Sequence, residues 1–188
     1  MTYLLQKIES IINSFDTEVQ NSLENIVVRK QLKKGEFLLQ EGIVCRKCFV
    51  LEEGIARKYL IAKNKEVTTE LYYKNDIMVS FDSFCNQIPS VKWIQTLSKA
   101  TVIQLNFHEF QTLKALYPEL IKLDLTIAEH YTIWLEKKLI DFRTLDASER
   151  YLNLLKKKPH YLQHIPLNIT ASYLGVAIET LSRIRAKV

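Results

Sequence analysis

The chain has 188 residues, of which 47% are hydrophobic and 25% are charged, and its formal net charge is +5. This length and composition suffice for one large or two small domains with a buried core. The sequence has no run of 18 apolar residues, and the amphipathic stretch Met1 to Asn13 contains charges, which argues against a membrane-spanning helix and a signal peptide. We therefore expect a soluble, cytoplasmic protein.

Two short helices are predicted at the start of the chain. Apolar residues recur at helical spacing between Leu4 and Ile12, and Asp16 is placed to cap a second helix that runs to about Asn25. We expect these helices to form a lid on the segment that follows.

From Ile26 to Asn106 the sequence has the periodicity of strands. Turn pairs such as Lys34-Gly35 and Lys74-Asn75 separate short β-rich runs. Eight strands joined by such frequent turns predict a closed or double-layered antiparallel fold. The expected strands are Ile26–Leu32, Glu36–Leu39, Phe49–Leu51, Ile55–Ile61, Glu66–Tyr72, Asp76–Phe81, Val91–Leu97 and Thr101–Leu105.

Three glycine motifs in this region resemble those of a known fold. Lys33-Lys34-Gly35-Glu36, Gln40-Glu41-Gly42 and Glu53-Gly54 follow one another as in the β-roll of cyclic-nucleotide-binding domains. The resemblance implies a β-roll, which is a double-stranded β-helix or jelly roll, with a ligand pocket. In that family a Gly-Glu pair and an Arg-Ser or Arg-Thr pair hold the phosphate, between the sixth and seventh strands.

The corresponding segment here, Ser80 to Ser90, lacks these groups. It reads SFDSFCNQIPS, with no Gly, Glu or Arg. Because a buried phosphate without a cation or glycine amides would be poorly compensated, we expect no cyclic-AMP binding. The pocket is then either filled by its own aromatic side chains or lined for another effector. The candidate lining residues are Phe81, Phe84, Ser90, Lys92 and Trp93.

The cysteines do not form a recognisable metal or disulfide site. Cys45 and Cys48 form an isolated Cys-x-x-Cys where a loop enters a strand, and a zinc site would need two further ligands. Three cysteines are an odd number, which argues against a disulfide framework. We expect ordinary thiols, with a redox role as the alternative, and no metal or cofactor. No catalytic triad, phosphate loop or carboxylate pair stands out, so we predict no catalytic residues and no enzyme.

A long helix is predicted after the strands. Asn106 and Glu109 form a variant of the capping box for a helix to about Tyr117, and Pro118 opens a second helix that ends near Thr144. Two apolar stripes run along this long helix. The first is a heptad seam of Ile121, Leu125, Ala128, Thr132, Leu135, Leu139 and Phe142, and the second is Leu120, Leu123, Ile127, Tyr131 and Trp134. We predict that the second stripe packs on the β-roll and that the seam forms a parallel homodimer, the alternative being a helix buried within a monomer.

The last part of the chain carries most of the positive charge. From Asp146 to Val188 seven cations stand against three acids, so this segment has a net charge of +4, as a phosphate-binding module needs. Asp146 and Glu149 form a capping box for a helix that ends at Lys157, and we expect a hinge here. A shortened winged hairpin is expected from His160 to Pro166.

Two short helices at the end of the chain meet at Gly175, which permits the positive φ of a tight turn. Apolar contacts are expected from Leu174, Val176, Leu181, Ile184 and Val188, with Ala171 where the helices cross. The second helix then turns polar side chains outward, and these can bind DNA bases and phosphates, the alternative being a plain helical hairpin with a solvated face. They are Glu179, Thr180, Ser182, Arg183 and Lys187.

The run from Ala171 to Ile184, ASYLGVAIETLSRI, closely resembles the helix-turn-helix of Crp/Fnr-type bacterial transcription regulators. Together with the β-roll motifs, the resemblance covers essentially the whole chain. It implies that Glu179 and Arg183 read bases, and that Thr180 and Ser182 contact the DNA backbone. In contrast to the family pattern, Ala177 stands where Ser or Thr usually caps the recognition helix, a loss of about 1 kcal/mol. Ile178 stands where Pro or Arg is frequent, and it either contacts a thymine methyl or packs against a neighbouring loop.

These observations predict an α+β protein with three parts. Residues 1–117 form a cyclic-nucleotide-binding-like β-roll with flanking helices, 118–145 form the long dimerisation helix, and 146–188 form a winged-helix-like helix-turn-helix domain. We predict a homodimeric, sequence-specific transcription regulator that binds a palindromic operator in double-stranded DNA. The alternative is a small-molecule sensor or protein-interaction module with a degenerate DNA-binding domain. An unidentified effector and RNA polymerase are further candidate partners, whereas a membrane is not.

Overall fold

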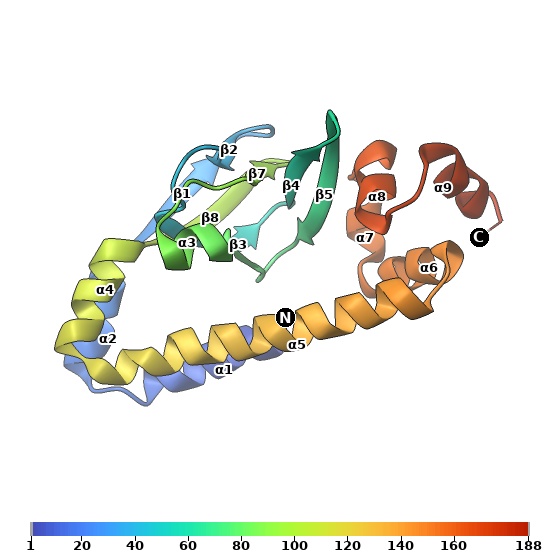
Figure 1. The fold of residues 1–188 in the computed structure, drawn as a ribbon. Helices are drawn as coiled ribbons and strands as arrows, with labels where there is room; N and C mark the ends of the chain where they lie inside the picture. The colour runs from blue at the N-terminus through green and yellow to red at the C-terminus, as the bar shows by residue number, and fades with distance from the viewer. Residues whose placement is uncertain (1, 188) are drawn as a thin grey trace.

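The computed structural model describes residues 2–187. An antiparallel β-roll lies along a single long helix, and a group of short helices closes the C-terminal end of that helix (Figure 1). None of the helices in the described chain is long and apolar enough to cross a membrane.

The β-roll consists of two four-stranded antiparallel sheets, and all eight predicted strands are present. The first sheet has the order β1-β8-β3-β6, and the second has the order β2-β7-β4-β5. This topology confirms the predicted double-layered roll. The strands are β1 (Val27–Leu32), β2 (Phe37–Leu39), β3 (Lys47–Glu53), β4 (Ala56–Ala62), β5 (Lys65–Tyr72), β6 (Ile77–Met78), β7 (Trp93–Thr96) and β8 (Ala100–Asn106).

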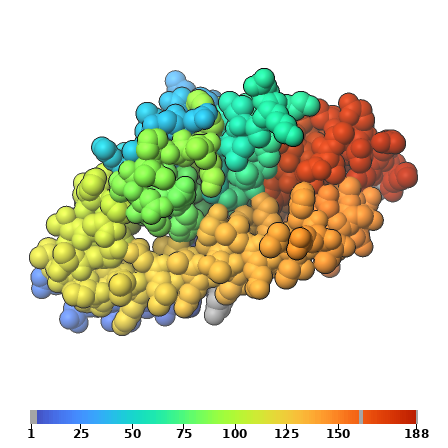
Figure 2. Space-filling model, in the orientation of Figure 1, coloured from blue at the N-terminus to red at the C-terminus, as the bar shows by residue number. Residues whose placement is uncertain are grey.

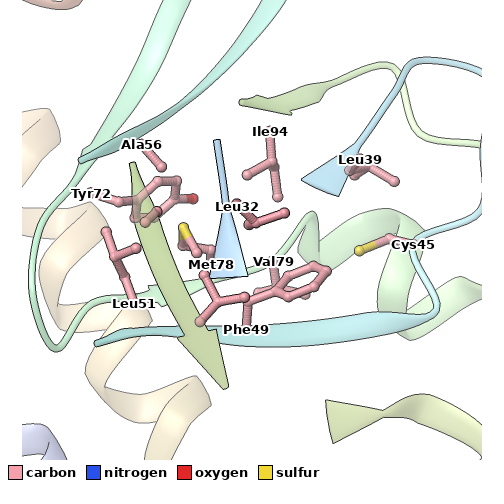
Figure 3. Packing of buried hydrophobic residues seen from close by; sticks show 12 residues of the cluster. Leu32, Leu39, Cys45, Phe49, Leu51, Ala56, Tyr72, Met78, Val79 and Ile94 are labelled. Carbon is pink, nitrogen blue, oxygen red and sulfur yellow. The ribbon is translucent and has the colours of Figure 1, made fainter. Parts of the chain in front are cut away.

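The core of the roll lies between the two sheets. Alternate side chains along β3 and β8 point into it, so that Phe49, Leu51 and Val102 are buried, and they meet Ile94 of β7 and Met78 of β6. Figure 3 shows these side chains, except Val102, in contact inside the roll. The apolar residues that alternate along these strands therefore point to one face of each sheet and fill the space between the sheets.

The sixth predicted strand is shorter than expected. β6 covers only Ile77–Met78, and the chain then forms the helix α3 (Phe81–Asn86). The buried hydroxyl of Ser83 in α3 accepts a hydrogen bond from the Cys45 amide at 2.8 Å and donates one to the Ile88 carbonyl. These two bonds hold α3 against a distant loop, and the sequence around Phe81 gives no local sign of them.

The N-terminal helices pack on α4 (Phe107–Leu116), on the long helix α5 (Ile121–Thr144) and against the outer face of the first sheet, which agrees with the predicted lid. α1 (Thr2–Asn13) lies along α5, and α2 (Thr17–Asn25) packs on α4. The 3₁₀ turn η1 (Pro118–Leu120) joins α4 to α5. A separate apolar cluster, which includes Phe15, Val19, Phe110, Leu113 and Leu123, fixes the start of α5.

The two apolar stripes of the long helix differ in burial. Leu120 and Leu123 of the second stripe are buried against α2 and α4. Tyr131 of the same stripe contacts the roll through Glu70 and α3 through Phe81. The apolar seam is largely open, since Ile121, Leu125 and Leu139 are each about 60% exposed.

Beyond the long helix lie the C-terminal helices, α6 (Ala147–Lys157), α7 (Pro159–Leu162), α8 (Leu167–Leu174) and α9 (Ile178–Arg185). The predicted capping box is present, because Asp146 accepts from the Glu149 amide and the Glu149 carboxylate accepts from the Asp146 amide. The prediction of a hairpin between His160 and Pro166 is wrong, because the described chain forms the helix α7 there. A helical turn begins at Pro159 instead, at the first helical position that proline favours.

Candidate nucleic-acid interface

The last two described helices, α8 and α9, cross over a small buried core. Leu181 and Ile184 of α9 pack against Ala171 and Leu174 of α8 and against Tyr151 of α6. Ala171 is almost completely buried, which agrees with the small residue expected at the crossing. Val176 is partly buried against the same core, and Val188 lies outside the described residues.

The turn between α8 and α9 favours glycine because its backbone φ is positive. Gly175 has a φ of 68° and ends α8, while the Val176 amide donates to the Ala171 carbonyl at 3.0 Å. A Cβ on Gly175 would lie 2.8 Å from Cζ of Phe142, which belongs to the long helix. The Phe142 ring, assigned to the seam from its spacing, therefore lies against this turn, and the Arg150 guanidinium sits 4.8 Å from its centre.

α9 exposes one polar face. Glu179, Ser182, Arg183 and Lys187 are exposed and Thr180 is partly buried. No ion pair among the described residues involves any of these side chains. The two apolar positions Leu181 and Ile184 face the opposite way, so the polar face is held outward by the core.

The N-terminus of α9 lacks a side-chain cap. Ala177 has the extended backbone of an N-cap residue, and it makes no side-chain hydrogen bond. Ile178 is 45% exposed at the same end of the helix. This position is therefore open to a ligand rather than covered by a neighbouring loop.

A single hydroxyl attaches α8 to the edge of the roll. The Ser172 hydroxyl accepts from the Thr68 amide at 2.9 Å and donates to the Glu66 carbonyl at 3.1 Å, and both partners lie on the edge strand β5. Ile165 and Ile169 add an apolar contact with Leu71 and other roll residues. The position of α9 is thus set by the roll, through contacts that span about a hundred residues and have no local signal.

A buried ion pair fills the interior near the segment from Ser80 to Ser90. The Lys58 ammonium is 1% exposed and lies 2.5 Å from the Glu70 carboxylate and 3.0 Å from the Val79 carbonyl. Tyr72 and Tyr131 donate their hydroxyls to the same carboxylate, at 2.8 and 3.3 Å. Burial lowers the pKa of Lys58, although Glu70 opposes the shift. The cation is therefore already neutralised by a carboxylate and is not available to an anion.

The residues predicted to line an effector pocket lie in two separate places. Phe81 and Phe84 of α3 line an apolar cavity of about 600 Å³. Ser90 is buried in hydrogen bonds with Ser80 and with the backbone of Lys92, while Trp93 stacks on Tyr59 and donates to Glu41 at 3.3 Å. Phe81 and Phe84 therefore share one cavity, Ser90 lies beside the start of α3 through its bond to Ser80, and Trp93 makes its contacts elsewhere.

Cys45 and Cys48 are shielded thiols, whereas Cys85 is exposed. Cys45 is buried, and burial raises the pKa of the half-buried Cys48 thiol to about 12. Such a thiol stays protonated near neutral pH and reacts slowly. Among the described residues no three His, Cys, Asp or Glu side chains are grouped so that they could hold a metal ion.

Asp76 is a buried carboxylate that weakens the fold at neutral pH. It is 3% exposed; one oxygen accepts from the Tyr73 amide, and the other has no hydrogen-bond partner in the described chain. Burial raises the pKa of Asp76 to about 6. Because the folded state holds this proton more tightly than the unfolded state, stability falls as the pH rises above about 4, by about 3 kcal/mol once Asp76 is ionised.

Asp76→Asn should therefore stabilise the protein at pH 7.5, with a gain that disappears near pH 4. Urea unfolding at both pH values measures the change, and Asp82→Asn on the exposed surface of α3 serves as the control. An equal effect of Asp76→Asn at both pH values would contradict the buried-carboxylate explanation.

The sequence of this chain is similar to those of two transcriptional activator proteins. No protein-family model matches the chain. The transcriptional activator protein FnrA of Stutzerimonas stutzeri is 24% identical over 183 residues, which cover 91% of this chain and 75% of FnrA. The transcriptional activator protein anr of Pseudomonas aeruginosa matches with the same identity and coverage.

Two solved structures align over nearly the whole chain. The global regulator CLP of Xanthomonas campestris has a TM-score of 0.70 and 14% identity, and the alignment covers 92% of this chain and 91% of CLP. A regulator of the crp/fnr family from Eubacterium rectale has a TM-score of 0.70 and 15% identity, with 93% and 84% covered. The roll, the long helix and the C-terminal helices are therefore arranged as in these proteins.

Proposed function

We propose that this chain is a Crp/Fnr-type regulator, as its sequence relatives and its fold suggest. It would work as a homodimer that binds a palindromic DNA site and needs no cyclic nucleotide. The observation that carries the proposal is the polar face of α9, which projects from a core that fixes the helix. We divide the chain into a roll (1–117), a dimerisation helix (118–145) and a DNA-binding part (146–188). Such a regulator acts where the DNA is, in the cytoplasm.

In the proposed complex α9 enters the major groove. Arg183 would donate two hydrogen bonds to guanine O6 and N7, and Glu179 would accept from cytosine N4. Ser182, Thr180 and Lys187 would contact phosphate oxygens, which fix the register of the helix on the duplex. The exposure of four of these five side chains supports this assignment.

The apolar seam of α5 supports dimerisation. Ile121 lies four residues before Leu125, Leu139 follows two heptads after Leu125, and all three turn apolar surface to solvent. A second copy of the helix in parallel would cover this surface. It would place the two copies of α9 in successive major grooves, about 34 Å apart.

The buried ion pair argues against a cyclic nucleotide as the effector. An entering phosphate would approach the Glu70 carboxylate, which repels it, and would have to break the Lys58–Glu70 pair. The segment from Ser80 to Ser90 offers no Arg and no Gly in compensation. The free energy that is lost when a phosphate is desolvated would therefore not be offset by new hydrogen bonds or ion pairs.

Arg183→Ala should cost about 1–3 kcal/mol of DNA-binding free energy and relax the preference at one base position of each half-site. Arg185→Ala is the matched control, because it removes the same charge from the same helix but from outside the predicted reading face. The control should lower affinity for all sequences alike. Binding to a panel of singly substituted operators measures both, and an unchanged base preference in Arg183→Ala would remove that residue from base reading.

Selection of duplexes from a random pool tests the function as a whole. The purified protein, without added ligand, should enrich a motif of two related half-sites, and enrichment should fall steeply between a low and a high salt concentration. Failure of a folded dimer to enrich any motif would instead favour a sensor or interaction module, which the uncapped start of α9 at Ala177 makes the second candidate.

A further inference from the structure

The apolar cavity of about 600 Å³ lies outside the core of the roll. Its wall on the first sheet is made by Val50, Ile103 and Leu105, which alternate along β3 and β8 with the core residues. Helices α1, α3, α4 and α5 form the other walls. In Figure 2 the surface is hollowed between the green part of the roll and the yellow start of the long helix.

The lining carries almost no free charge. Among the described lining residues the ionisable ones are two cysteines and Asp124, and that carboxylate is paired with the adjacent Lys114. Gln111 is the one further polar side chain described in the lining. In this described lining there is no cation, and Lys114 is already paired, so an anionic ligand would be buried without a free counter-charge. The charges therefore select an uncharged occupant.

The cavity is also too large to be an ordinary packing defect. Protein interiors leave few voids larger than a water molecule, yet side chains that face this space, such as Val50, Phe81, Phe84 and Ile103, are only partly buried. Apolar cavities bind apolar molecules readily. Since a water molecule occupies about 30 Å³ in the liquid, the space suits a ligand of on the order of 15–20 non-hydrogen atoms.

We infer that this cavity, between the outer face of the first sheet and helices α1, α3, α4 and α5, binds an uncharged, largely apolar small molecule. The occupant would touch Phe81, whose ring centre lies 4.3 Å from that of Tyr131 on the long helix. The Tyr131 hydroxyl donates a hydrogen bond to Glu70 of β5, and the same strand is hydrogen-bonded to Ser172 of α8. A role as effector of DNA binding rests on the proposed function, whereas ligand binding itself does not.

The test uses the full-length protein and N-phenyl-1-naphthylamine, an uncharged probe whose fluorescence rises in apolar surroundings. Saturable binding of one probe per chain is expected. Decanol should displace the probe, whereas decanoate at pH 8 and cyclic AMP should displace it at least tenfold less effectively. Equal competition by decanol and decanoate would overturn the selection for an uncharged ligand.

Cavity-filling variants locate the site. Val50→Phe should weaken probe binding at least tenfold, and Cys85→Phe, at an exposed rim position on α3, repeats the test if the first variant folds poorly. Val28→Phe is the control, since Val28 is exposed in the same sheet and does not line the cavity. It should change affinity less than twofold.

Two results would overturn the inference. One is unchanged probe affinity in both filling variants, and the other is no saturable binding by a folded wild-type dimer, which would mean that the partner chain or repacked side chains fill the space. Operator binding is measured on the same samples without probe. Absence of operator binding in a protein that still binds the probe would contradict the proposed function and leave the cavity result intact.

Discussion

Leu139→Asp is expected to convert the proposed dimer into a monomer and to reduce operator binding by a factor of about 10²–10⁴, the range over which linked binding modules gain affinity. Leu139 is 60% exposed on the seam of α5. In a parallel dimer the two copies of residue 139 would face each other, so the variant would bury two like charges. A monomer would then hold one half-site only.

Ile133→Asp is the matched control for this variant. Ile133 is 65% exposed on the same helix, so it introduces the same charge at a similar exposure, but its position in the heptad lies away from the seam. Sedimentation velocity and operator titration on both variants separate the two explanations. If both variants stay dimeric, or both dissociate, the seam is not the dimer interface.

Lys58→Met is expected to lower the free energy of unfolding by about 3–5 kcal/mol, because removal of one partner leaves a buried charge without compensation. Glu70 is 7% exposed and would lose the ammonium that lies 2.5 Å away. The Tyr72 and Tyr131 hydroxyls would remain, but two neutral donors do not neutralise a carboxylate. Urea unfolding at neutral pH measures the loss.

The double variant Lys58→Met with Glu70→Gln tests the reason for that loss. Glutamine is neutral and keeps an oxygen that accepts from the tyrosine hydroxyls, so the double variant should recover most of the stability. A double variant as unstable as Lys58→Met alone would show that packing of the lysine stem, rather than the unpaired carboxylate, accounts for the effect.

Features set by neighbouring residues could be predicted from the sequence. Asn106 and Asp146 were identified as helix caps because a cap and its partner are three residues apart. Gly175 was identified as the turn because only a few residue types adopt positive φ. The eight strands followed from alternation and turn pairs, and the errors there were mostly of one or two residues.

Features set by distant residues could not be predicted. Ser172 bonds to β5 across more than a hundred positions, and nothing near it distinguishes this serine from a solvent-exposed one. The Lys58–Glu70 pair joins two strands, whereas an isolated lysine in a strand is more often exposed. The sequence also does not show that Trp93 stacks on Tyr59 while Phe84 lines the apolar cavity, because both contacts are made with residues distant in sequence.

The bond from Ser172 to β5 has a consequence for solubility. β5 is an edge strand, and the Thr68 amide and the Glu66 carbonyl are the groups with which such a strand would add a neighbour. While α8 is in place, one hydroxyl satisfies both groups. Any rearrangement that moved the C-terminal helices away from the roll would also uncover a strand edge open to edge-to-edge aggregation.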